Sequence, residues 1–132
     1  MPFPRRPVLL GAPFLLAASP LRAQGGFPDR PIRFVIPFAA GGGTSVIGRI
    51  VADGMAADLG RSLVIDNRPG AGGNVAAEFV AKSPADGYTL LYATVGIMAI
   101  NPALYRTVPF DPIRDFAPIT RMTTGPNVLV VG

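Results

Sequence analysis

Three consecutive glycines, Gly41 to Gly43, separate an apolar run from a stretch with helical periodicity. The apolar run at 32–36 is rich in β-branched residues and predicts a strand, whereas a helical pattern begins at Thr44 or Ser45. Glycine has no Cβ, so a ligand can approach the backbone of this loop closely. The first N–H groups of a helix lack partners within it and carry partial positive charge. The order strand, glycine loop, helix therefore predicts a site for a carboxylate or a phosphate.

Strand and helix patterns alternate along the rest of the chain. We predict strands at 32–36, 63–66, 89–93 and 127–131, helices from 44 or 45 to 59 and from about 75 to 82, and a helical turn at 102–105. This alternation indicates an α/β fold in which right-handed βαβ units form a mainly parallel sheet. Ligands of such sheets bind outside the carboxyl ends of the strands. We expect three loops at that edge: 37–43, 67–74 and 94–96.

Each of the two longer helices is predicted to place its large apolar side chains on the sheet. The hydroxyl of Thr44 or Ser45 is expected to cap the first helix, and Gly60 is expected to end it. The predicted packing faces are Val46, Ile47, Ile50, Val51, Met55 and Leu59 in the first helix and Val75, Phe79 and Val80 in the second.

Neither glycine loop matches a nucleotide-binding fingerprint. With Gly41 and Gly43 as the first pair of G-x-G-x-x-G, the last position is Val46, and Gly70 and Gly72 would place Val75 there. The chain also lacks G-x-x-x-x-G-K-[ST]. A nucleotide-binding α/β enzyme is therefore a distant alternative.

The composition disfavours catalysis. Cysteine and histidine are absent, which excludes disulfides and thiolate metal sites and removes the commonest general base. Ser45 has no base to activate it as a nucleophile, because the single lysine, Lys82, is expected at the far end of another helix. Asp66, Asp86 and Asp111 are predicted to accept hydrogen bonds from nearby N–H groups in loops and turns. We therefore expect a binding protein with no catalytic residue, no metal and no cofactor.

Residues 1–23 have the pattern of an export signal. Arg5 and Arg6 precede an apolar run at 8–18, and Leu21-Arg22-Ala23 ends in a small residue suited to cleavage. The run is shorter than the roughly 20 residues that a spanning helix needs, so a permanent anchor is the weaker alternative. We predict an exported protein, and both the Sec and the twin-arginine routes stay open.

Removal of this segment changes the charge of the chain. It holds three of the twelve Lys and Arg residues and none of the eight Asp and Glu residues, which leaves nine basic against eight acidic side chains. No basic run remains that could follow a phosphate backbone. We therefore predict no nucleic-acid partner.

Several motifs occur in series: VIPFAAGGGTS, VIDNRPGAGGN, DGYTLLYAT, NPALY, FDPIRDFAPI and PNVLVV. From about Phe27 to Gly132, their order and spacing resemble those of the periplasmic solute-binding proteins of tripartite tricarboxylate transporters, the Bug family. The resemblance implies a type II periplasmic-binding-protein-like fold, in which two lobes close on a small carboxylate. It also implies that residues 24–132 form part of the first lobe, that 127–131 crosses to the other lobe, and that the second lobe is missing.

The resemblance further implies site residues and partners. Backbone N–H groups, hydroxyls and ordered waters would hold the carboxylate, at Phe38, Ala39, Gly42, Gly43, Thr44, Ser45, Gly73, Asn74 and Thr94. The implied partners are membrane permease subunits, and the complete protein is expected to be a monomer. The alternative is a ligand-sensing lobe that feeds a periplasmic signalling partner.

Two positions depart from the family pattern. Many members carry aspartate where this chain has Ser45, and proline where it has Ala40. Serine supplies no charge to pair with an ammonium group. We therefore expect a plain mono- or dicarboxylate ligand in preference to an amino acid.

Overall fold

The computed structural model describes residues 26–125. The predicted export signal and the predicted strand at 127–131 lie outside the described residues. The elements in chain order are β1 (Ile32–Ile36), α1 (Gly43–Leu59), β2 (Leu63–Asn67), η1 (Ala71–Gly73), α2 (Asn74–Ala81), β3 (Thr89–Leu91), η2 (Gly96–Ile100) and α3 (Asn101–Leu104).

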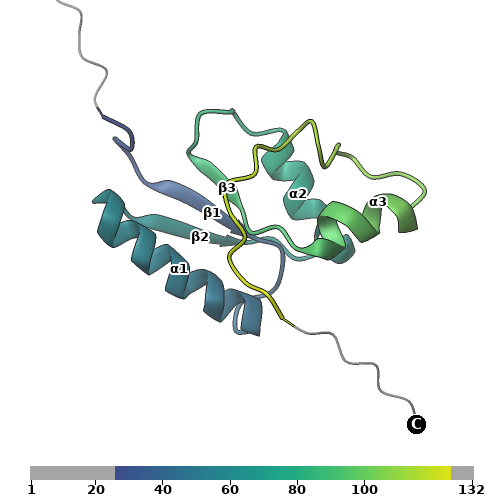
Figure 1. Cartoon of the computed structure of the whole chain (residues 1–132), viewed down its shortest axis with the longest axis horizontal. Coiled ribbons are helices and arrows are strands. Elements are labelled where there is room, and N and C mark those ends of the chain that lie inside the picture. The colour runs from purple at the N-terminus through teal and green to yellow at the C-terminus, as the bar shows by residue number, and fades with distance from the viewer. Residues whose placement is uncertain (1–25, 126–132) are drawn as a thin grey trace, which may run out of the picture.

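The three strands form a parallel sheet in the order β2-β1-β3 (Figure 1). Phe34 in β1 lies opposite Ile65 of β2 and Leu90 of β3. The central strand is the most buried, and only Arg33 of its five residues is exposed. The α/β class and the parallel pairing predicted from the alternation of elements are confirmed. β3 is shorter than predicted and ends at Leu91 instead of Ala93.

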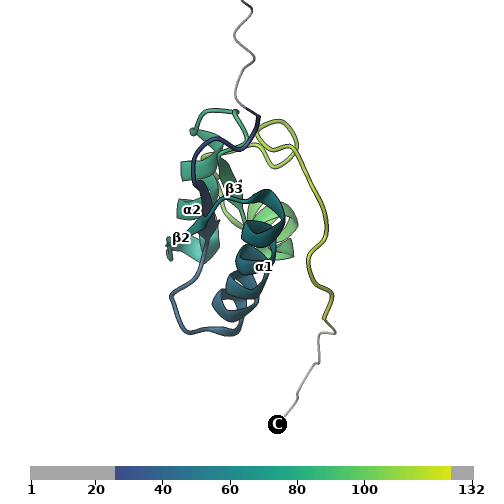
Figure 2. The same ribbon diagram turned by 90° about the vertical axis from the view of Figure 1, so that its left-hand side faces the viewer.

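Helices cover both faces of this sheet. Figures 1 and 2 show α1 and α2 on opposite sides of the strands, and Ile97 of η2 packs with Ala77 of α2. Because side chains alternate along a strand, the sheet has a core on each face, and Leu90 and Leu91 of β3 pack against different ones. The core under α1 contains Phe34, Ile36, Ala52 and Tyr92, and the core on the other face contains Ala77, Ile97 and Phe110.

The packing face predicted for α1 is wrong for four of its six residues, since only Val51 and Met55 are half-buried. Ser45, Gly48 and Ala52 are the buried residues of this helix. A Cβ at Gly48 would lie 2.6 Å from Ile36 Cδ1, so the helix approaches the sheet too closely for larger side chains along this line. The larger apolar residues are displaced to the flanks, and those that are exposed are Val46, Ile47, Ile50 and Leu59.

α2 also packs through small side chains. Ala76 and Ala77 are fully buried, whereas Val75, predicted to pack, is 44% exposed. Phe79 is half-buried, and the Arg68 guanidinium lies 3.5 Å from the centroid of its ring. In both helices the distance between helix and sheet determines which residues pack. A helix this close to the sheet leaves room only for small side chains such as those of glycine, serine and alanine.

The segment before β1 is fixed by a pair of side chains. The Tyr88 hydroxyl donates to Asp29 Oδ1 at 2.6 Å, and the Asp29 backbone N–H donates to the same hydroxyl oxygen at 2.9 Å. The hydrogen bond from Tyr88 lowers the pKa of Asp29, and the carboxylate raises the pKa of Tyr88. The stability that Asp29 contributes is therefore complete above its ordinary pKa and is lost as pH falls through the lowered value.

Tyr88→Phe is expected to raise the pKa of Asp29 back toward its ordinary range, because the donor to the carboxylate is removed. Carboxyl ¹³C shifts followed against pH measure this change. Asp111 is the internal control, since its pKa is lowered by the backbone N–H groups of Ile113 and Arg114. An Asp29 pKa that stays depressed in Tyr88→Phe would show that Tyr88 is not the cause.

Candidate functional site

The loop between β1 and α1 ends in a helix start without a side-chain cap. Gly42 is the N-cap residue, with φ −76° and ψ 163°, and its carbonyl accepts hydrogen bonds from the N–H groups of Ser45 and Val46 at 2.9 and 3.1 Å. The predicted cap by the hydroxyl of Thr44 or Ser45 is wrong. A glycine N-cap offers no side chain to the first turn, so the N–H groups of that turn stay open to a ligand.

Three successive backbone N–H groups are free at this helix start. Within residues 26–125, the nitrogens of Gly42, Gly43 and Thr44 donate to no backbone oxygen. The first turn of α1 contains no acidic residue, and the helix is 17 residues long, so its positive end is not neutralised by its own side chains. This arrangement of donors suits an anion.

The second loop, at the start of α2, uses its own N–H groups. The Gly73 nitrogen donates to the Gly70 carbonyl at 2.8 Å, and the Asn74 nitrogen donates to the Ala71 carbonyl. Gly73 has φ +96°, and a Cβ there would lie 2.6 Å from Ile97 Cδ1 and 3.1 Å from Pro37 Cβ. The loop therefore contacts both the end of β1 and η2.

Thr94 begins a helical segment, whereas the sequence predicted a loop at 94–96. Its carbonyl accepts from the Met98 N–H at 3.1 Å, and its hydroxyl lies 3.5 Å from the Ile97 nitrogen. η2 follows at Gly96 and continues directly into α3. Pro102 has no N–H for a bond to the previous turn, and the wider π-type winding of η2 accommodates this loss.

The sequence prediction missed two asparagines that hold the loops together. Asn67 Nδ2 donates to the Phe38 carbonyl at 2.8 Å, which joins the end of β2 to the first loop. Asn101 Nδ2 donates to the Gly72 carbonyl at 3.1 Å and to Asn74 Oδ1 at 2.7 Å. Both residues stand within the quoted motifs, and Asn67 directly precedes the second glycine loop, but Asn101 is about thirty positions from the loop that it contacts.

The predicted site residues divide into two groups. Phe38, Ala39, Gly42 and Gly43 are exposed on the first loop, beside the half-buried Thr44. Gly73 and Asn74 are buried at the start of the second helix, and Thr94 is half-buried at the third strand end. Ser45 stands apart from the free N–H groups, because its side chain is on the packed face of α1 and its N–H donates to the Gly42 carbonyl.

Asp86 and Asp111 accept backbone N–H groups as predicted. Asp66 instead forms an ion pair with Arg68, with 2.9 Å between Oδ2 and Nε. Within residues 26–125, no cluster of three or more acidic, cysteine or histidine side chains could hold a metal ion. In the same range, no helix has the length and hydropathy needed to cross a membrane.

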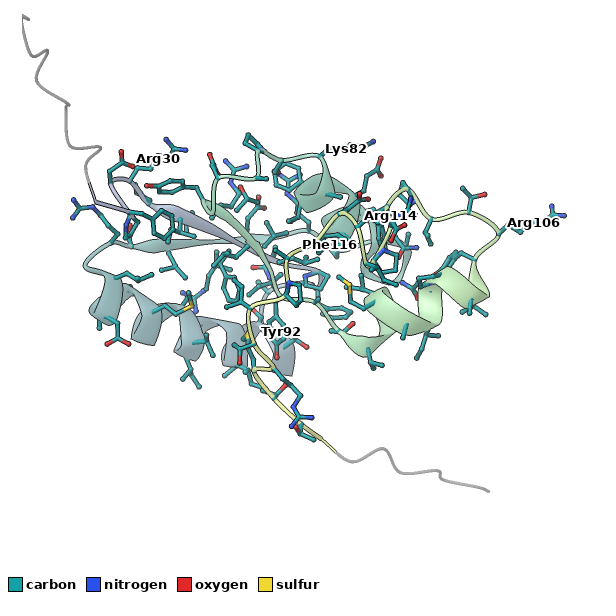
Figure 3. The ribbon with its side chains drawn as sticks, turned by 45° about the horizontal axis from the view of Figure 1, so that its top comes forward. Arg30, Lys82, Tyr92, Arg106, Arg114 and Phe116 are labelled. Atoms are coloured by element: carbon teal, nitrogen blue, oxygen red, sulfur yellow. The ribbon has the colours of Figure 1, made fainter. Side chains whose placement is uncertain are left out.

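Two hollows lie on the surface of the described residues, and the smaller one borders the loop that carries the free N–H groups. The larger, about 840 Å³, lies over the row Arg33, Val64 and Thr89 near the amino ends of the strands. Arg30 and Lys82 line it and appear on the same edge of the molecule in Figure 3. The smaller, about 350 Å³, is a groove along α1 that Ala40, Gly41, Ser45, Val46, Arg49, Ile50 and Asp53 line.

A family model described as the tripartite tricarboxylate transporter family receptor, TctC, matches residues 47–132. The chain belongs to this family. It is 41% identical over 129 residues to a UPF0065 protein encoded in the tcbD–tcbE intergenic region of Pseudomonas sp. strain P51, covering 96% of this chain and 38% of that protein. BugT of Bordetella pertussis is 38% identical over 114 residues, covering 86% of this chain and 35% of BugT.

Solved structures agree with this TctC-family assignment. Rpa4515 of R. palustris with adipate is 48% identical with a TM-score of 0.63, and the match covers 65% of this chain and 29% of that chain. MatC of Rhodopseudomonas palustris with bound malate is 39% identical with a TM-score of 0.67, covering 70% and 31%. The periplasmic binding protein BugD is 39% identical with a TM-score of 0.68, and the match covers 70% of this chain and 31% of BugD.

The resemblance and the binding-protein-like fold stated from the sequence are confirmed. The family is one of receptors, and these solved neighbours are binding proteins and not enzymes, so the nucleotide-binding enzyme is set aside. The chain spans about 35 to 38% of the length of the curated relatives BugT and the Pseudomonas protein.

Proposed function

We propose that this chain supplies the carboxylate-receiving loops of a periplasmic solute-binding protein for a tripartite tricarboxylate-type transporter. The observation that carries the proposal is the set of three free N–H groups at Gly42, Gly43 and Thr44, at the positive end of a 17-residue helix. Adipate and malate in two solved relatives support a small carboxylate as the ligand. Of the other predicted site residues, Phe38 and Ala39 belong to the same loop, Gly73 and Asn74 lie at the start of α2, and Thr94 follows β3.

The remaining organisation follows from the same proposal. Residues 1–23 direct export, residues 24–132 belong to the first lobe of a two-lobed domain, and the loaded receptor docks on membrane permease subunits. The mass of the protein recovered from the periplasm tests the export signal, since cleavage after Ala23 leaves Gln24 as the first residue. Recovery of the uncleaved chain in the membrane fraction would contradict it.

The donors described here set the expected strength of binding. A helix N-terminus contributes about 0.3 to 1 kcal/mol to an exposed anion and about 2 kcal/mol in favourable geometry. Micromolar affinity requires about 8 kcal/mol. We therefore expect this chain by itself to bind adipate or malate with a millimolar dissociation constant, and a micromolar constant from an NMR titration would contradict this estimate.

Gly43→Pro is expected to weaken adipate binding about tenfold without unfolding the protein. A hydrogen bond to a charged group contributes about 1.5 to 3 kcal/mol, and proline deletes one such donor. Gly43 is the first residue of α1, where proline fits, and Gly42 already has the extended conformation that suits a residue before proline. Chemical-shift titration of the labelled chain with adipate measures the affinity.

Gly43→Ala is the matched control, because it keeps the N–H and its Cβ would have no neighbour within 4 Å. Wild-type affinity in Gly43→Pro would remove the first loop from the site. A parallel titration with malate and aspartate tests the ligand class. Tighter binding of aspartate would contradict the expectation, drawn from Ser45, of a ligand without an ammonium group.

A further inference from the structure

We propose that Asn101 is a positioning residue of the ligand site, which turns the side-chain amide of Asn74 so that its nitrogen faces the ligand. The inference rests on the function proposed above and goes beyond it, because Asn101 lies outside the loops that receive the carboxylate. Asn101 begins α3, and Asn74 begins α2. Both residues are buried and in contact: Asn101 is 6% exposed and Asn74 is 5% exposed.

The contact between the two amides has one chemically consistent orientation. A backbone carbonyl only accepts hydrogen bonds, so the group of Asn101 that lies 3.1 Å from the Gly72 oxygen must be its nitrogen. That nitrogen carries two hydrogens, and its second contact is at 2.7 Å with Asn74. The Asn74 atom at this contact must therefore be its oxygen, and the Asn74 nitrogen points away from Asn101.

The Asn74 nitrogen is then left as a donor for an external group. Within residues 26–125 it has no acceptor, although no side-chain nitrogen or oxygen in this range is both buried and unpaired. This nitrogen therefore reaches solvent, at the start of α2. The adjacent Gly73 packs against Pro37 at the end of β1, so the donor belongs to the edge of the sheet that holds the first loop.

The loop geometry leaves little room for another arrangement. Gly72 has φ +64°, and a Cβ there would lie 3.3 Å from Asn101 Nδ2 and 3.2 Å from the Tyr105 hydroxyl. Asn101 of α3 and Tyr105, which follows this helix, thus pack directly on the backbone of the second loop. Asn101 links this loop to the helical segment that follows β3.

Asn101→Asp tests the role, because aspartate has the same shape but no amide nitrogen. A carboxylate only accepts, so the Asn74 amide is expected to rotate and donate its nitrogen to Asp at position 101, which removes that donor from the ligand. Titration of the full chain with adipate should then show about tenfold weaker binding. In an Asn74→Ala background the same change should alter the affinity less than twofold. Equal losses in the two backgrounds would overturn the proposal.

Asn101→Ser is a second, uncharged variant that tests the same role if Asn101→Asp fails to fold. Its single hydroxyl can serve the Gly72 carbonyl but leaves Asn74 without a donor, so it is expected to weaken adipate binding as Asn101→Asp does. Wild-type affinity in a folded Asn101→Ser would overturn the positioning role.

A measurement without ligand tests this inference independently of the proposed function. It follows the exchange of the Asn74 side-chain amide hydrogens with water through their ¹⁵N-detected NMR signal. In the wild type the amide hydrogens should exchange rapidly with water, and in Asn101→Asp they should become protected. If the Asn74 amide hydrogens exchange at the same rate in Asn101→Asp as in the wild type, the inference is overturned, regardless of the affinity measured for adipate. If the wild type binds neither adipate nor malate but Asn101→Asp protects the Asn74 amide hydrogens, the proposed function is refuted. The orientation inferred for Asn74 then still holds.

Discussion

Replacement of Gly73 by alanine is expected to lower the free energy of unfolding by about 3 kcal/mol. Gly73 has φ +96°, and a left-handed conformation costs a residue with a Cβ about 1 to 2 kcal/mol. The added Cβ would also lie 2.6 Å from Ile97 Cδ1 and 3.1 Å from Pro37 Cβ, and overpacking of this kind costs about 1 to 3 kcal/mol. Urea denaturation followed by circular dichroism measures the loss.

Gly41→Ala separates the two contributions. Gly41 has nearly the same conformation, with φ +91°, but a Cβ there would meet nothing within 4 Å. This variant is therefore expected to lose only the conformational part, about 1 to 2 kcal/mol. Equal losses in the two variants would show that the contact of the second loop with Ile97 is not close-packed.

Ile97→Ala is expected to destabilise the protein by about 2 to 5 kcal/mol, the range for removing a large aliphatic side chain from a core. Ile97 is completely buried and packs with Ala77 and Phe110 in the core under α2. The residue also supports Gly73, so the loss should appear in the global unfolding transition and not only in η2. The free energy from urea denaturation checks this.

Ile100→Ala is the matched control in the same helical segment. Ile100 is 52% exposed, so removal of the same atoms is expected to cost less than about 1 kcal/mol. Similar losses in Ile97→Ala and Ile100→Ala would contradict the assignment of Ile97 to the core. The comparison needs no assumption about helix propensity, because both substitutions are isoleucine to alanine in one segment.

The features that the sequence predicted well are those set by local patterns. β1 has its predicted bounds, because an apolar run interrupted only by Arg33 at a sheet centre is typical of a buried strand. Gly60 ends α1 in the left-handed conformation, with φ +64°, as a glycine after an amphipathic stretch predicts. The parallel sheet follows from the alternation of strand and helix signals.

The features that it missed depend on distances between elements. Large apolar residues predicted the packing face of α1, but the approach of Gly48 to Ile36 selects small ones. The loop predicted at 94–96 overlaps only the first residue of η2, and the rest of η2 was missed, because the five residues before Asn101 carry no periodicity that separates a π-type turn from an extended segment. Neither fact can be read from one segment alone.

The candidate site shows the same division. Its loops follow from the order of strands, glycines and helices. Which N–H groups are free does not follow, because the Ser45 and Gly73 nitrogens donate to carbonyls three residues earlier, whereas those of Gly42 and Gly43 have no backbone acceptor in the described chain. The roles of Asn67 and Asn101 also depend on contacts with residues far away in the sequence. Asn67 contacts a residue 29 positions away, and Asn101 contacts residues 29 and 27 positions away.

The first loop is tied at both ends and open between them. Asn67 holds the Phe38 carbonyl at its entry, and the Gly42 carbonyl anchors α1 at its exit. A Cβ at Gly41 or Gly43 would meet nothing within 4 Å, so the backbone between these two ties is open to solvent. If this loop receives a carboxylate as proposed, its backbone donors contact only the charged end of the ligand, so discrimination between acids by length or substituents depends on groups outside the loop.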